Sequence, residues 1–78
     1  EEAIEKYKMA TEVNSNYAYA FNNWGATLDH LGRYEEAIEK YKMAAEIEPH
    51  YAYVYNRWGN DLFNLNRYEE AIENIKRL

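Results

Sequence analysis

The sequence predicts an all-α fold built from antiparallel helix-turn-helix repeats of 34 residues. The phrase EEAIEKYKMA fills residues 1–10, returns unchanged at 35–44, and closes the chain at 69–78 as the diverged EEAIENIKRL. Residues 1–34 and 35–68 are identical at 21 of 34 aligned positions without a gap. The chain has only three Gly and one Pro, so nearly all of it can be helical. A period of this length indicates a unit of two helices.

The repeated phrase is itself predicted to be helical. In the copy at 35–48, apolar residues recur at spacings of three and four, and charged residues fill most of the opposite face. Acidic residues open each copy, where the helix dipole favours them, and Glu36 and Lys40 are spaced for an ion pair. The same pattern predicts helices at 1–14 and 69–78.

Two further helices are predicted between the copies, at 18–31 and 52–65. The first of them carries one apolar stripe at helical spacing, made of Phe21, Trp24, Leu28 and Leu31. Tight turns are expected to join the resulting five helices.

Turn residues mark the predicted helix ends. Gly32 and Asn66 stand at equivalent places, and both residue types tolerate the left-handed backbone that ends helices. Pro49 follows the third predicted helix, which cannot continue through it. Asn16 and His50 precede the next helices, and Asn is a good N-terminal cap.

Composition excludes several classes of protein. A chain of 78 residues forms one small domain, and without cysteine it has neither disulfides nor thiolate chemistry. Fourteen acidic against nine basic residues argue against a nucleic-acid or anionic-membrane partner. No apolar run approaches the roughly 18 residues of a membrane-spanning helix, and no signal peptide precedes the first repeat. We therefore expect a cytoplasmic protein without membrane insertion, and the start inside a repeat favours an excised or engineered segment.

The sequence offers no pattern typical of catalysis, and we expect neither an enzyme nor a cofactor. His30 and His50 are 20 residues apart with no acid at metal-ligand spacing, so a solvated or capping role is favoured over a metal site. The motifs HExxH, GxxxxGK and GxSxG are absent from the sequence. The repeated acid pairs are interpreted as solvated first turns of helices.

The spacing of aromatic and small residues resembles the tetratricopeptide repeat. The full signature is carried by Phe21, Trp24-Gly25, Leu28, Tyr34, Ala37, Tyr41, Ala44 and Pro49. The next copy gives Tyr55, Trp58-Gly59, Leu62, Tyr68, Ala71 and Ile75, and the first, partial copy gives Ala3, Tyr7 and Ala10. Trp stands where the family usually has Leu, and Phe or Tyr where it usually has Trp. The larger side chain has thus moved to a neighbouring core site while the total volume of the two sites stays about the same, and core packing tolerates such swaps.

The resemblance implies a helix order of B-A-B-A-B within a single segment at 1–78. Residues 1–17 are expected to be a partial repeat with helix B only, 18–51 a full repeat, and 52–78 a truncated second repeat. The small residues of the signature are expected to let two helices approach closely, namely Gly25, Gly59, Ala37 and Ala71.

In this family the A helices line a concave groove that holds an extended peptide or a partner helix. Carried over, the groove-facing candidates are Tyr19, Asn22, Asn23 and Ala26, with Asp29 or His30, then Tyr53, Asn56, Arg57 and Asn60, with Phe63 or Asn64. Amides can bracket a peptide backbone, and tyrosine provides contact area at low entropic cost. The alternative is that these polar residues are merely solvated, with Tyr19 and Tyr53 shielding the seam between repeats.

Members that hold the C-terminal carboxylate of heat-shock chaperones use a clamp of Lys and Asn, then Asn, then Lys and Arg. Here Asn23 and Arg57 match the middle Asn and the final Arg, whereas Tyr53 replaces the last Lys. A carboxylate would meet only one cation, so the sequence disfavours a chaperone tail as the ligand.

The two ends of the array predict a second function, self-association. A repeat unit contacts only its neighbours, and terminal units need a polar cap that this chain lacks. Apolar residues are expected to remain uncovered there, and the candidates are Ile4, Tyr7 and Val13 at one end and Ile72, Ile75 and Leu78 at the other. Such faces favour homo-oligomers, through end-to-end stacking or exchange of terminal helices. The two interpretations are thus a module that binds a protein or peptide and a self-associating structural unit.

Overall fold

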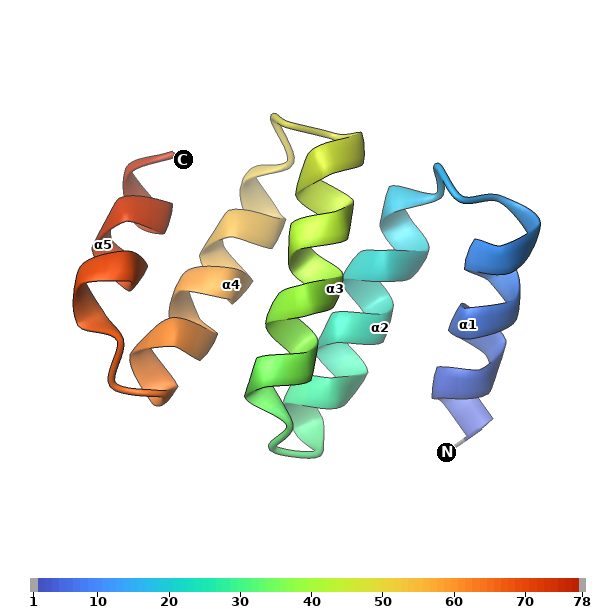
Figure 1. Ribbon diagram of the computed structural model, residues 1–78, viewed down its shortest axis with the longest axis horizontal. Helices are drawn as coiled ribbons and strands as arrows, with labels where there is room; N and C mark the ends of the chain where they lie inside the picture. The colour runs from blue at the N-terminus through green and yellow to red at the C-terminus, as the bar shows by residue number, and fades with distance from the viewer. Residues whose placement is uncertain (1, 78) are drawn as a thin grey trace.

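The computed structural model describes residues 2–77, which form five α-helices. These are α1 (Glu2–Val13), α2 (Ala18–His30), α3 (Tyr34–Ile47), α4 (Ala52–Asn64) and α5 (Tyr68–Lys76). The helices run antiparallel in chain order from α1 at one side to α5 at the other, so the two ends of the chain lie far apart (Figure 1). The array measures 35 × 26 × 13 Å between Cα atoms and is therefore a thin slab. The predicted all-α hairpin fold is confirmed.

The predicted C-terminal stops of α2 and α4 are confirmed. Gly32 and Asn66 adopt φ values of 73° and 62°, in the left-handed region. The N–H groups of Arg33 and Arg67 donate to the Leu28 and Leu62 carbonyls at 2.9 and 2.8 Å, as in a Schellman motif.

The prediction that Asn16 and His50 precede the helices as capping positions is wrong by one residue. The N-caps of α2 and α4 are Tyr17 and Tyr51, and neither makes a side-chain capping hydrogen bond. Asn16 instead lies in the preceding turn, where its backbone N–H donates to the side-chain oxygen of Asn14 at 3.0 Å.

The expected pairing of Glu36 with Lys40 is replaced by two other contacts. Glu36 accepts two hydrogen bonds from Arg33, at 2.7 and 2.8 Å. The Lys40 ammonium lies over the Trp24 ring, 3.9 Å from its centroid. A cation over an aromatic face competes well with an exposed ion pair, because solvent screens the latter strongly.

The core runs along α2, α3 and α4. Its largest fully buried apolar side chains are Leu28, Tyr41, Val54 and Leu62. The exchanged aromatic pairs of the two repeats stack in the same way, with ring centroids 6.2 Å apart for Phe21 and Trp24 and 6.0 Å apart for Tyr55 and Trp58. The two repeats therefore pack their aromatic pairs in the same way.

The two signature glycines differ in how tightly they are packed. A Cβ atom on Gly25 would lie 2.5 Å from the buried Tyr41 ring, closer than atoms can approach. On Gly59 the nearest atom would be the Ala71 carbonyl oxygen at 3.5 Å, an ordinary contact. The close approach predicted from the signature requires glycine at Gly25, but alanine would fit at Gly59.

Each helix packs on the next one in the chain, and α2 also contacts α4. The two predicted A helices are therefore neighbours and share a face. None of the helices within residues 2–77 combines the length and apolar character needed to cross a membrane.

Helix α5 leaves two apolar side chains uncovered. Ile72 and Ile75 are 54% and 50% exposed, whereas their equivalents in α3, Ile38 and Tyr41, are 3% and 0% exposed because α3 is packed between α2 and α4. At the other end of the slab, Val13 is 89% exposed, while Ile4 packs against the core and Tyr7 is half-buried. Leu78, also a self-association candidate, lies outside the described residues.

Candidate binding face on helices α2 and α4

The candidates predicted from the sequence lie on α2 and α4, but they differ in accessibility. Seven are exposed to solvent: Tyr19, His30, Tyr53, Asn56, Asn60, Phe63 and Asn64. Four are half-buried: Asn23, Ala26, Asp29 and Arg57. Asn22 is only 3% exposed, so its amide belongs to the interior between the helices rather than to the open surface.

Arg57 and Tyr53 are neighbours one turn apart on α4. An Arg57 Nη donates to the Tyr53 hydroxyl at 2.8 Å, and the guanidinium carbon lies 4.5 Å from the Tyr53 ring centroid. Burial would lower the pKa of Arg57, but hydrogen bonds with the Tyr53 and Tyr41 hydroxyls raise it, so the group stays cationic. The face thus presents one positioned guanidinium stacked on an exposed ring.

Beneath Arg57 lies a buried acidic cluster that joins α2, α3 and α4. The Tyr41 hydroxyl donates to a carboxylate oxygen of Asp29 at 2.5 Å. Asp61 is 2% exposed, and burial, followed by its hydrogen bond to Asp29 and the Asp29 charge, raises the pKa of Asp61 to about 9. The pKa of Tyr41 is raised as well, by burial and by Asp29.

Asp61 therefore carries a proton at neutral pH. Asp29 Oδ1 and Asp61 Oδ2 are buried, and neither has a hydrogen-bond partner among the described residues. A proton shared between the two carboxyl groups would satisfy both oxygens and would link the neighbouring A helices.

The sequence did not single out this cluster, although a signal for Asp61 was available. Asp61 lies three residues after Trp58 and four before Leu65, which places it on the core side of its helix. An acid on a core-facing stripe implies a buried partner, but the partner's identity depends on how α2 sits beside α4.

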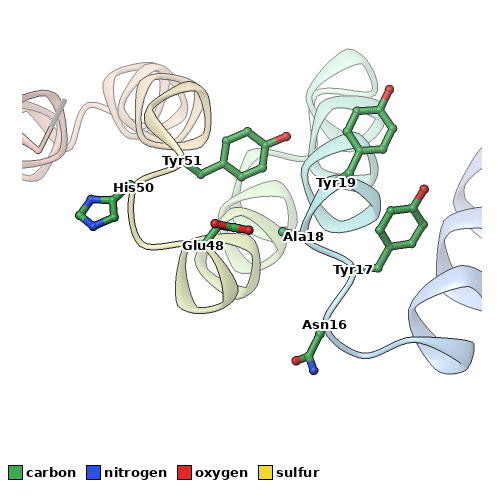
Figure 2. A pocket seen from close by; sticks show the side chains of 7 residues that line it. All are labelled: Asn16, Tyr17, Ala18, Tyr19, Glu48, His50 and Tyr51. Atoms are coloured by element: carbon green, nitrogen blue, oxygen red, sulfur yellow. The ribbon is translucent and has the colours of Figure 1, made fainter.

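A cavity of about 530 Å³ opens at the N-terminal ends of α2 and α4. We call it the tyrosine pocket, and it is lined by Asn16, Tyr17, Ala18, Tyr19, Glu48, His50 and Tyr51. Figure 2 shows the Tyr17, Tyr19 and Tyr51 rings pointing the same way, while Asn16 and His50 point away from them. Burial and the nearby Tyr19 raise the pKa of Tyr51. Of these residues, the sequence singled out only Tyr19 for the face, although Tyr17 and Tyr51 recur with the 34-residue period.

Within residues 2–77, no three His, Cys, Asp or Glu side chains gather as the ligands of a metal ion would. What the face offers chemically is hydrogen bonding, aromatic contact and one cation.

Comparison with known proteins shows what this chain is similar to. The tetratricopeptide repeat family model matches residues 18–51, and no curated protein matches the sequence significantly. A crystal structure of MamA superposes on 95% of this chain with a TM-score of 0.93 and 27% identity, and a second MamA structure gives 0.92 and 27%. This chain spans only 43% and 40% of those two MamA chains.

The same fold occurs in the second TPR of Spaghetti (RPAP3), solved bound to the HSP90 peptide SRMEEVD. It matches 95% of this chain and is 68% covered by it, with a TM-score of 0.91 and 22% identity. The resemblance and fold expected from the sequence are both confirmed.

Proposed function

We propose that this chain is a protein-interaction module. It carries a match to the tetratricopeptide repeat at residues 18–51 and has the fold of such repeat arrays. It holds a peptide or an extended partner segment against the face formed by α2 and α4. The groove-lining residues are Tyr19, Tyr53, Asn56, Arg57 and Asn60, with Asn23 and Ala26 at its floor.

The observation that carries this proposal is the preset pair of Arg57 and Tyr53. A guanidinium that already stacks on a ring loses little side-chain entropy when a peptide carbonyl or carboxylate binds to it. Exposed tyrosine and asparagine surround the pair, whereas the exposed surfaces of the B helices carry mainly Glu and Lys. A face of this composition suits recognition better than simple solvation.

Peptide binding by a protein of the same fold supports the proposal, because the RPAP3 repeat is described with an HSP90 peptide. The acidic tail itself is a poor candidate for this chain. Arg57 is the one cation matched to the carboxylate clamp, and Asp29 and Asp61 lie beneath it.

A peptide selected from a random display library tests the proposal. Arg57→Glu is expected to weaken binding of the selected peptide at least tenfold, since it reverses the central charge and breaks the Tyr53 contact; a tenfold loss corresponds to about 1.4 kcal/mol. Lys76→Glu makes the same charge change on α5, away from the face, and should leave the affinity unchanged. Tyr53→Leu, at an exposed position, provides a second variant if Arg57→Glu unfolds. Equal affinities across all three variants would contradict the proposed face.

A second candidate function, self-association, is favoured by the uncovered face of α5. Ile72 and Ile75 occupy positions that α3 buries beneath α4, so a second copy could supply the missing cover. Burying one such side chain contributes about 1.5–3 kcal/mol, which is substantial for a small domain. This function uses the ends of the slab rather than the face of α2 and α4, so both can operate in one molecule.

A further inference from the structure

The tyrosine pocket lies at one end of the proposed binding face and has an unusual charge balance. Three of its seven lining residues are tyrosines, and none is Lys or Arg. Glu48 is the one acidic side chain among its lining residues. Figure 2 shows the Glu48 carboxylate between Ala18 and Tyr51, with the Tyr51 and Tyr19 rings on either side of the opening.

Elsewhere the chain places its own cations over aromatic rings. Lys40 lies 3.9 Å from the Trp24 ring centroid, Arg57 4.5 Å from that of Tyr53, and Arg77 5.6 Å from that of Trp58. No described Lys or Arg occupies such a position over the three pocket tyrosines. No described cation of this chain therefore stacks on these rings in competition with a cation from outside.

We propose that the tyrosine pocket binds an ammonium group, namely the side chain of a lysine in a basic partner segment. Tyr19 and Tyr51 provide the aromatic walls, and Glu48 provides the opposite charge. The pocket rests on the proposed function, because it specifies the side-chain chemistry that one end of the same face recognises. The net charge of -5 also attracts basic segments over longer distances.

The helix ends around the pocket have opposite electrostatic effects on a bound ion. The positive N-terminal ends of α2 and α4 border it and would favour an anion. The negative C-terminal end of α3, which ends at Ile47, borders it too and offsets part of that effect. Arg57 acts on Tyr51 from outside the lining and would oppose a cation there. Glu48 lines the pocket itself and would repel an anion, so the balance favours an ammonium group.

Three small probes test this assignment in a titration of the ¹⁵N-labelled chain followed by NMR. They are tetramethylammonium chloride, tert-butanol as a neutral molecule of similar bulk, and sodium acetate as an anion, all against matched sodium chloride. We expect the ammonium ion alone to cause saturable shifts at the amides of Tyr17, Tyr19 and Tyr51. Its affinity should exceed that of tert-butanol by about fivefold or more.

Substitutions locate the binding. Glu48→Gln, at an exposed position, should lower the ammonium affinity by about threefold or more, and Tyr51→Leu should do the same by removing a ring. Glu46→Gln is the matched control, because it removes the same charge two residues away, in the last turn of α3 and outside the pocket. If Tyr51→Leu fails to fold, Glu48→Gln and its control still decide the question.

Equal shifts with ammonium and tert-butanol, saturable binding of acetate instead, or no effect of Glu48→Gln would each overturn the pocket assignment. Selected peptides that bind through Arg57 while ammonium does not bind would reject only the pocket. Ammonium binding at the pocket in a chain that binds no selected peptide would support the pocket and reject the proposed function.

Discussion

At the scale of single residues, the least expected feature is the buried carboxyl group of Asp61, whose pKa is raised to about 9 by burial and by Asp29. A proton kept on Asp61 lets two acids share the seam between α2 and α4 without the full repulsion of two buried charges. Tyr41 completes the link from α3, and Arg57 lies close enough to reduce the remaining charge. The face proposed to bind peptides therefore lies over a cluster in which Tyr41 donates a hydrogen bond to Asp29.

The raised pKa of Asp61 predicts a pH dependence of stability. The folded chain keeps a proton up to about pH 9 that the unfolded chain releases near pH 4, so the free energy of unfolding should fall as pH rises through this window. The slope from this group is at most about 1.4 kcal/mol per pH unit. Asp61→Asn should flatten the dependence, since the amide stays neutral and can still donate to Asp29.

Urea denaturation at pH 5 and pH 8 measures this difference, with Glu73→Gln on the exposed surface of α5 as the control. If the wild-type chain and Asp61→Asn lost the same stability between the two pH values, the shared proton would be contradicted.

The two signature glycines give a matched pair of substitutions. Gly25→Ala should lower the free energy of unfolding by about 1–3 kcal/mol, because the new methyl group meets the buried Tyr41 ring, which its hydrogen bond to Asp29 holds in place. Gly59→Ala should be neutral or stabilise by up to about 1 kcal/mol, because alanine is the better helix former and the space is open. Thermal or urea unfolding compares them, and equal losses at both sites would contradict the packing described.

At the scale of the helices, the sequence predicts the order and bounds of the elements to within about two residues. Repetition is the reason, since the stripe of Phe21 and Trp24 recurs with Tyr55 and Trp58. The ends of α2 and α4 can also be predicted locally, because Gly32 and Asn66 are residue types that tolerate the left-handed backbone found there.

The acid cluster and the tyrosine pocket depend instead on how neighbouring helices are placed. Asp29 and Asp61 occupy different positions in their repeats, so aligning the two copies does not pair them. The pocket draws residues from α2 and from the turns that precede α2 and α4, and Glu48 becomes part of it only when α3 ends beside the start of α2. Sequence reasoning at the level of one helix therefore misses both.

The exposed face of α5 makes its own prediction about assembly. If a second copy covers this face, the molar mass measured by light scattering should rise across a hundredfold range of concentration. Replacing Ile72 and Ile75 together by Asn should abolish the rise, because it removes the apolar surface that drives burial. Met43→Asn, at a comparably exposed apolar residue of α3, is the control. A wild-type chain that stays monomeric throughout would remove self-association from the account.

At the scale of the whole molecule, different parts of the slab carry different kinds of side chain. The A helices carry amides, tyrosines and Arg57, the B helices carry most of the Glu and Lys, and the ends carry uncovered apolar side chains. The central claim is that the shared face of α2 and α4 is where a partner segment binds.

Chemical-shift mapping with a peptide selected for binding tests that claim most directly. We expect the perturbed amides to cluster at Tyr19, Tyr53, Asn56 and Asn60, with the largest shift of a side-chain signal at Arg57. Perturbations concentrated on the outer surfaces of α3 and α5, or at the apolar ends of the slab, would contradict it.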